Sequence, residues 1–102
     1  MHEDLTRDFF LGFIKLHILH HAREEPIYGK EFSRELERHG YRISFGTLYP
    51  LFHRLRREGY LKVEEKNVNG RIRKYYSVTG KGERALRDSM GKIKELFDEV
   101  YG

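Results

Sequence analysis

The stretch of sequence at residues 44–78 reads SFGTLYPLFHRLRREGYLKVEEKNVNGRIRKYYSV. Its first half predicts a helix over residues 44–58, because Ser44 is a favourable N-cap and the apolar residues that follow recur at helical spacing. These apolar residues are Leu48, Phe52 and Leu55. Pro50 lies within the helix and is expected to bend it, since proline lacks the N–H of an interior helical bond. Gly59 follows as a stop signal.

The second half of the stretch predicts a hairpin. Asn69 and Gly70 stand between two β-prone runs, and this dipeptide favours a two-residue turn. Such a turn fixes the register, and the expected pairs are Val68 with Arg71, Lys66 with Arg73, Val63 with Tyr76 and Leu61 with Val78. The apolar pairs share one face. On the other face Lys66 opposes Arg73, and a phosphate would relieve the repulsion between them.

The rest of the chain predicts three more helices. The first covers about residues 6–23 with Thr6 as its cap, the second about residues 28–39, and the last about residues 79–101 with Thr79 as its cap. Three helices followed by a hairpin is the order of a winged helix-turn-helix. We therefore expect a mainly α fold with a small β-hairpin wing, extended by a long C-terminal helix.

Charge is distributed unevenly along the chain. The 102 residues carry a net charge of +4, but residues 42–81 hold ten cations and three anions, a net charge of +7. The flanking segments are mildly acidic, at −2 for residues 1–41 and −1 for residues 82–102. In a winged helix-turn-helix protein the third helix enters the major groove of DNA and the wing lies against the backbone. The basic block covers these two elements, so position and charge together predict double-stranded DNA as the partner.

The composition argues against several other classes of protein. The chain has no cysteine, and therefore no disulfide framework or thiolate metal site. Its longest mostly apolar stretch is too short and too polar to span a membrane, and no signal-peptide pattern opens the chain. We expect a cytoplasmic protein without membrane association. Phosphate-binding glycine motifs and serine–histidine–acid arrangements are absent from the sequence, so an enzyme is not predicted.

Three histidines of the first predicted helix are candidate metal ligands. His17 and His21 are four residues apart, a spacing at which two imidazoles on one helix face can bind zinc or nickel, and Glu24 follows three residues later. His20 lies beside them. Without a third and a fourth ligand, structural or solvent-exposed histidines are the better interpretation. We predict neither a metal nor a cofactor.

Several motifs resemble those of the PadR-type transcriptional regulators. Residues 44–50 (SFGTLYP) match the family pattern S-x-G-T-L-Y-P, and residues 70–76 (GRIRKYY) match the pattern G-R-x-x-[KR]-Y-Y of its winged hairpin. Val78 replaces the usual Leu of the L-T-x-x-G pattern that ends here at Gly82, and Ile27 departs from a family His. The resemblance implies a dimeric regulator, usually a repressor, with one long C-terminal helix. It also implies release of DNA when a small molecule or a stress signal acts on the dimer.

Candidate DNA contacts follow from position and from this resemblance. Those on the helix at 44–58 are Ser44, Thr47, Tyr49, Pro50, His53, Arg54 and Arg57, and those on the wing are Lys66, Asn69, Gly70, Arg71, Arg73 and Lys74. Hydroxyl and N–H groups near the helix start can donate to phosphate, and the resemblance assigns contact to Thr47, Tyr49 and Pro50. A half-buried packing role is the alternative for Tyr49. Arg54 and Arg57 point outward, toward either a guanine edge or a phosphate.

The terminal helices carry more apolar surface than one small domain can cover. The last helix repeats apolar residues at spacings of four and three, which is the pattern of a coiled-coil seam. The expected dimer contacts are Phe9, Phe13, Leu86, Met90, Ile93, Phe97 and Val100. We therefore divide the chain into a winged helix-turn-helix domain over residues 1–78 and a dimerisation helix over residues 79–102, and expect a homodimer on an inverted-repeat operator. Packing of the last helix on its own domain is the alternative.

Two other functions remain open at this point. A winged helix can bind a protein without touching DNA, but His53, Arg54 and Arg57 argue against an apolar docking face on the third helix. An RNA-binding domain requires exposed aromatic residues on a sheet, and only Tyr75 offers one, since Tyr76 is expected to point inward. Neither the operator nor a small-molecule effector is identified by the sequence.

Overall fold

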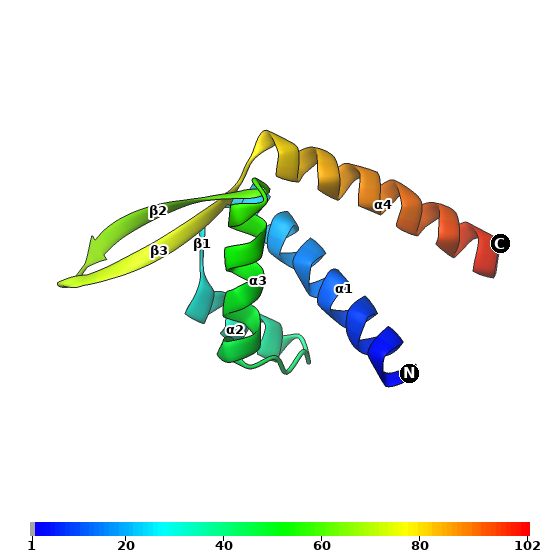
Figure 1. Ribbon diagram of the computed structural model, residues 1–102, viewed down its shortest axis with the longest axis horizontal. Coiled ribbons are helices and arrows are strands. Elements are labelled where there is room, and N and C mark those ends of the chain that lie inside the picture. The colour runs from blue at the N-terminus through cyan, green and yellow to red at the C-terminus, as the bar shows by residue number, and fades with distance from the viewer. Residues whose placement is uncertain (1) are drawn as a thin grey trace.

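The computed structural model describes residues 2–102, with side chains from residue 4 onward. The elements, in chain order, are α1 (His2–Glu24), β1 (Ile27–Tyr28), α2 (Gly29–Arg38), α3 (Phe45–Arg57), β2 (Leu61–Val68), β3 (Arg71–Val78) and α4 (Gly80–Tyr101). The β2–β3 hairpin extends to one side of the molecule, and α1 and α4 project to the other (Figure 1). The predicted fold, mainly helical with a hairpin wing, is confirmed.

Helix α1 is longer than predicted. It begins at His2 instead of Thr6, so Thr6 is an exposed residue inside the helix and not its cap. No glycine or proline precedes Thr6, and Asp4 adds negative charge near the positive end of the helix dipole. No helix among the described residues is long and apolar enough to cross a membrane.

The short strand β1 was not predicted from the sequence. The second helix is expected to begin at Tyr28, but Tyr28 belongs to β1 and the helix begins at Gly29. Strand β1 pairs with β3 in antiparallel register, with Ile27 opposite Tyr76 and Tyr28 opposite Tyr75. Among the described residues the sheet therefore has three strands, in the order β1–β3–β2.

The ends of α3 follow the predicted capping signals. The Ser44 Oγ accepts a hydrogen bond from the Thr47 N–H at 3.2 Å. At the other end Gly59 has a φ of +87°, and the Tyr60 N–H donates to the Leu55 carbonyl at 2.8 Å. This left-handed glycine and the backward hydrogen bond form a Schellman-type stop.

The hairpin has the predicted register. Its pairs include Val68 with Arg71, Lys66 with Arg73, Val63 with Tyr76 and Leu61 with Val78. The turn residues Asn69 and Gly70 have φ values of 53° and 82°, and a type I′ turn requires two such positive values. The Asn67 Oδ1 accepts the Gly70 N–H at 2.9 Å and so closes the turn.

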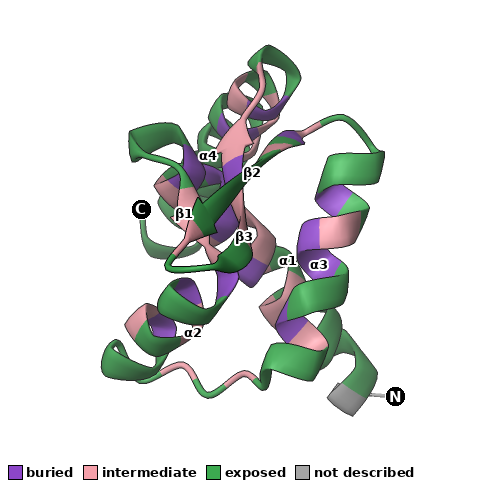
Figure 2. Cartoon of the chain, turned by 90° about the vertical axis from the view of Figure 1, so that its left-hand side faces the viewer, coloured by how far each residue is buried: buried purple, intermediate pink, exposed green. Residues whose placement is uncertain are grey.

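The core lies between the helices and the inner face of the sheet, with Phe52 of α3 at its centre. The Phe52 ring lies 5.9 Å from the Phe32 ring of α2 and 4.8 Å from the Tyr76 ring of β3, measured between centroids. Buried residues face inward on α2 and α3, whereas the outer faces of both helices are exposed (Figure 2). Because Phe52 contacts both a helix and the sheet, the outer face of α3 and the wing are held in a fixed arrangement.

Helix α4 begins inside the core and ends outside it. Thr79 caps it as predicted, since the Thr79 Oγ1 accepts the Gly82 N–H at 3.1 Å. Leu86, which the sequence places in the dimer interface, is 3 % exposed and belongs to the core of its own chain. The first turns of α4 follow directly from β3 and lie against the domain, so the exposed part of the apolar seam begins at Met90.

Candidate nucleic-acid interface

Three arginines of α3 are exposed, Arg54, Arg56 and Arg57, and Arg56 was not among the predicted contacts. Arg54 and Arg57 lie away from the buried stripe, as the helical spacing predicts. The Arg54 Nε lies 3.5 Å from the Glu58 Oε2, and both side chains are solvent-exposed. A surface ion pair of this kind contributes about 0–1 kcal/mol, so Arg54 can exchange Glu58 for another anion at little cost.

Aromatic rings line the first turns of the same helix. The Phe45 and Tyr49 centroids are 5.5 Å apart, and the Tyr49 and His53 rings meet edge to face at 4.4 Å. Tyr49 is 36 % exposed, so it both packs within the helix and reaches solvent. Phe45 is 39 % exposed and was not a candidate, because the variable position of its motif carries no polar signal. An exposed phenyl ring suits contact with a thymine methyl group.

The polar groups at the start of α3 are partly used by the helix cap. The Thr47 N–H donates to the Ser44 Oγ, and the Ser44 hydroxyl donates to the Thr47 Oγ1 at 3.1 Å. The Thr47 N–H is therefore not free to donate to phosphate, whereas the Thr47 hydroxyl keeps its hydrogen. Pro50 is exposed on the outer side of the helix and offers no N–H.

The candidate residues of the wing divide between the two faces of the hairpin. Asn69, Gly70 and Arg71 are exposed at the tip. Lys66 and Arg73 form an opposed pair and, by the alternation of strand residues, share the outer face with Arg71. Lys74 lies on the opposite face, half-buried and directly across from Glu65. The structure thus groups Lys66, Arg71 and Arg73 and separates Lys74 from them.

The opposed cations of the wing are each placed over an aromatic ring. The Lys66 Nζ lies 5.2 Å from the centre of the Tyr75 ring, and the Arg73 Cζ lies 4.7 Å from the centre of the Tyr28 ring. An exposed cation–π contact is worth about 0.5–1 kcal/mol, comparable with the cost of opposing like charges on neighbouring strands. Tyr75 is half-buried beside Tyr28 instead of standing free, so its ring is less available for stacking on a base than the sequence suggests.

One cation of the basic block is engaged in the fold itself. The Lys81 Nζ donates to the Glu58 carbonyl at 2.7 Å and lies 4.5 Å from the centre of the Tyr60 ring. The Thr79 Oγ1 donates to the Gly59 carbonyl at 2.6 Å. The first turn of α4 therefore satisfies carbonyls at the C-terminal end of α3 and fixes the base of the wing beside it.

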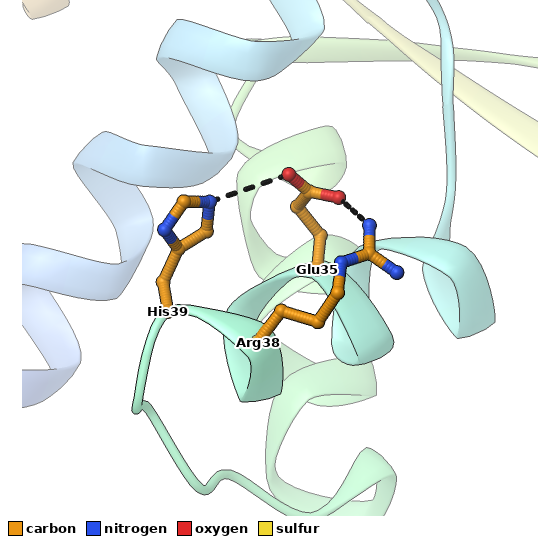
Figure 3. Close-up of polar contacts among 3 residues, drawn as sticks. All are labelled: Glu35, Arg38 and His39. Carbon is orange, nitrogen blue, oxygen red and sulfur yellow. Dashed lines mark hydrogen bonds and ion pairs between the residues drawn. The ribbon is translucent and has the colours of Figure 1, made fainter.

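The C-terminal end of α2 carries a separate polar cluster (Figure 3). One Glu35 oxygen accepts a hydrogen bond from Arg38, and the other lies 3.3 Å from the His39 Nε2. The hydrogen bond from Arg38 and its positive charge lower the pKa of Glu35, which therefore stays ionised. Arg38 and His39 have a carboxylate partner close by in sequence, so this cluster adds little positive potential.

The histidines of α1 form a row of rings. His17 and His21 are stacked with centroids 6.1 Å apart, and His20 meets His21 edge to face at 5.1 Å. Burial lowers the pKa of His17 and of His21, and the neighbouring imidazoles lower both further. Among the described residues no group of three or more histidine or acidic side chains is placed to hold a metal ion.

Three helices, a hairpin wing and a basic outer surface define a winged helix-turn-helix protein of the transcription-regulator class. The profile of the "Transcriptional regulator PadR-like family" matches residues 18–88. The chain belongs to this family, whose members regulate transcription by binding DNA and are not enzymes.

Individual relatives extend the match to nearly the whole chain. The transcriptional regulator Rv3488 of Mycobacterium tuberculosis is 45 % identical over 96 residues, which cover 94 % of this chain and 90 % of the relative. A PadR-like transcription factor from Bacteroides fragilis has a structure with a TM-score of 0.85 at 32 % identity, covering 95 % of both chains. A PadR family regulator from Eggerthella lenta has a TM-score of 0.81 at 35 % identity, covering 97 % of this chain and 91 % of its own.

Proposed function

We propose that this chain is a repressor that binds an inverted-repeat operator as a homodimer, with α3 in the major groove and the β2–β3 wing against the DNA backbone. The observation that carries the proposal is the net charge of +7 in residues 42–81, a segment that contains α3, the wing and the first residues of α4 in a PadR-family chain. The exposed cations include Arg54, Arg56 and Arg57 on α3 and Lys66 and Arg71 on the wing. In this proposal Ser44, Thr47 and Tyr49 contact phosphates beside the start of α3.

The exposed apolar surface of α1 and α4 supports the dimer. Phe9 is 70 % and Phe97 is 60 % exposed, and both line an open groove of about 750 Å³ between the two helices. Exposed large apolar residues continue along α4 at Met90, Ile93, Leu96, Val100 and Tyr101. A monomer rarely leaves so large an apolar surface in water.

The occupant that fits this groove is α4 of a second copy of the chain. That helix carries the same apolar row that lines the groove, so a two-fold axis lets each copy cover the exposed surface of the other. The dimer also provides the second recognition helix that an inverted repeat requires, about 34 Å or a multiple of that distance from the first.

Selection of bound sequences from random duplex DNA is the direct test of the proposal. The expected result is an inverted repeat whose half-sites lie about one helical turn apart or a multiple of it. Enrichment of a single unrepeated half-site, or no enrichment at all, would contradict the proposal.

Salt titrations and substitutions that remove a charge test which residues contact DNA. Affinity should fall steeply as salt rises, because neutralised phosphates release counterions. Arg71→Ala should weaken all duplexes about equally, whereas Arg54→Ala or Arg57→Ala should relax sequence preference by about 1–3 kcal/mol where the arginine reads a base. Arg7→Ala removes the same charge from an exposed position on α1 and should leave affinity unchanged. A DNA affinity that does not change with salt concentration would instead favour a winged helix that binds a protein.

Sedimentation of the full wild-type chain and of a variant with a charge in the apolar row of α4 tests the dimer. Phe97→Asp should convert a dimer into a monomer and lose most operator affinity, because a lone half-site loses its linked second contact. Gly91→Asp is the matched control, since it adds the same charge to α4 where a Cβ meets nothing within 4 Å. A wild-type monomer that binds its operator tightly would refute the dimer.

A further inference from the structure

Strand β1 places an uncharged residue, Tyr28, among the cations of the wing. Tyr28 lies opposite Tyr75 in the β1–β3 pair, and the two ring centroids are 5.8 Å apart. Arg73 lies over the Tyr28 ring and Lys66 over the Tyr75 ring, at 4.7 Å and 5.2 Å. We call these four side chains the cation–ring ladder, because on one face of the sheet they follow one another as cation, ring, ring, cation.

The ladder holds two charges that would otherwise separate. Lys66 and Arg73 face each other across β2 and β3, and their repulsion favours rotamers that carry both side chains apart into solvent. The negative face of each tyrosine ring attracts the cation above it and so opposes this separation. Tyr75 and the more distant negative charge of Glu31 also favour the charged form of Arg73 and raise its pKa. Glu64 lies on the same face, but within the described residues neither Lys66 nor Arg73 forms an ion pair with a carboxylate.

We propose that Tyr28 is a positioning residue of the DNA interface, which holds Arg73 beside Lys66 as a preorganised pair of cations for the backbone phosphates of duplex DNA. This inference rests on the proposed function, because it assigns the pair to the wing contact with DNA. A phosphodiester fits the pair, since the two adjacent cations form no ion pair with a carboxylate and can bind a further anion. An arginine that a ring already holds loses less conformational freedom when it binds phosphate than one that moves freely.

Tyr28 would act from outside the elements that touch DNA in the proposed function. It belongs to the connection between α1 and α2, and it reaches the wing only because β1 pairs with β3. Its contribution is therefore predicted to pass entirely through Arg73, which makes the coupling between these two residues the quantity to measure.

The experiment is a double-mutant cycle with the full chain on its selected operator, followed by fluorescence anisotropy. Tyr28→Leu should weaken binding about two- to fivefold, the range that one exposed cation–π contact of about 0.5–1 kcal/mol allows. Tyr28→Phe keeps the ring and is the matched control, expected to bind the operator as wild type does. In an Arg73→Ala background Tyr28→Leu should cost nothing further, and the salt dependence of Tyr28→Leu should shift toward that of Arg73→Ala.

Proton NMR of the unbound protein reads the geometry separately from DNA binding. The ring current of Tyr28 should displace the Arg73 side-chain protons upfield, and the displacement should vanish in Tyr28→Leu and persist in Tyr28→Phe. Thermal unfolding of each variant establishes that the fold is retained. If Tyr28→Leu does not fold, Tyr28→Phe is compared with wild type instead, and both its Arg73 chemical shifts and its DNA affinity must match those of wild type.

The outcomes separate this inference from the function on which it rests. Wild-type protein without affinity for any duplex would overturn the proposed function, and the inference with it. Wild-type binding together with unchanged affinity of Tyr28→Leu, or with an equal loss in the Arg73→Ala background, would overturn the inference alone.

Discussion

Replacing Gly82 with alanine should destabilise the fold, although alanine is the better helix former. A Cβ at this position would lie 2.3 Å from the Tyr60 carbonyl oxygen and 2.6 Å from the Val78 Cγ2. Both distances are about 1 Å short of van der Waals contact. The Tyr60 carbonyl cannot simply withdraw, because it accepts the Thr79 N–H at 3.1 Å where the wing joins α4.

The magnitude follows from the kind of atom that the methyl group meets. Overpacking against backbone costs about 1–3 kcal/mol, which exceeds the gain of about 0.5–1 kcal/mol in helix propensity. The middle of each range leaves a net loss of about 1 kcal/mol, and for a domain of this size each kcal/mol corresponds to about 4–8 °C, so Gly82→Ala should melt roughly 5–10 °C lower than wild type.

Gly91 provides a control on the same helix. A Cβ there meets nothing within 4 Å, so Gly91→Ala should gain about 0.5–1 kcal/mol from helix propensity alone. Thermal and urea unfolding of both variants should be compared at one protein concentration, because association shifts apparent stability. A Gly82→Ala variant as stable as wild type would show that α4 and the base of the wing are not packed as described.

Three further predictions concern stability. Ser44→Ala should cost about 1 kcal/mol in urea unfolding, because the Thr47 N–H loses its cap; no loss would mean that the α3 terminus is held otherwise. The Tyr76 hydroxyl is buried and has no hydrogen-bond partner among the described residues, so Tyr76→Phe should be neutral or slightly stabilising, and a loss above about 1 kcal/mol would reveal a missing partner. Burial lowers the pKa of His17 and His21 below 6.5, so below that pH the unfolded chain binds protons that the folded chain does not. The melting temperature should therefore fall between about pH 7 and about pH 5, and replacing both histidines with glutamine should flatten this dependence.

The elements that could be predicted from the sequence are those with local signals. Asn69 and Gly70 accept the positive φ values of a type I′ turn, and that turn determines every strand pair back to Leu61. Ser44 and Gly59 mark the two ends of α3 through hydrogen bonds that span only a few residues. The outward direction of Arg54 on α3 needs only the helical period.

The features that could not be predicted depend on contacts between distant residues. Strand β1 is two residues long and shows no periodicity, so it is determined by the β3 edge that it meets almost fifty residues later. The apolar repeat of α4 identifies the apolar face of the helix but not what covers it. The sequence therefore predicts both Leu86 and Met90 in the dimer interface, although the domain buries Leu86 and leaves Met90 exposed. Tyr28 carries no charge, so no charge pattern connects it with Arg73.

Strand β1 also attaches the base of the wing to the helices on either side of it in the chain. It joins Glu24 at the end of α1 to Gly29 at the start of α2 and is hydrogen-bonded to β3, while Thr79 ties the other side of the wing base to α4. The wing is thus an arm of eight-residue strands, about 26 Å long, whose base is attached to both terminal helices. Over this length a rotation of roughly 5° at the base would displace the tip at Asn69 by about 2 Å, enough to break a hydrogen bond that the tip makes in the proposed DNA complex. Because Thr79 and Lys81 also bind the carbonyls that end α3, a displacement of this base would move α3 and the wing together.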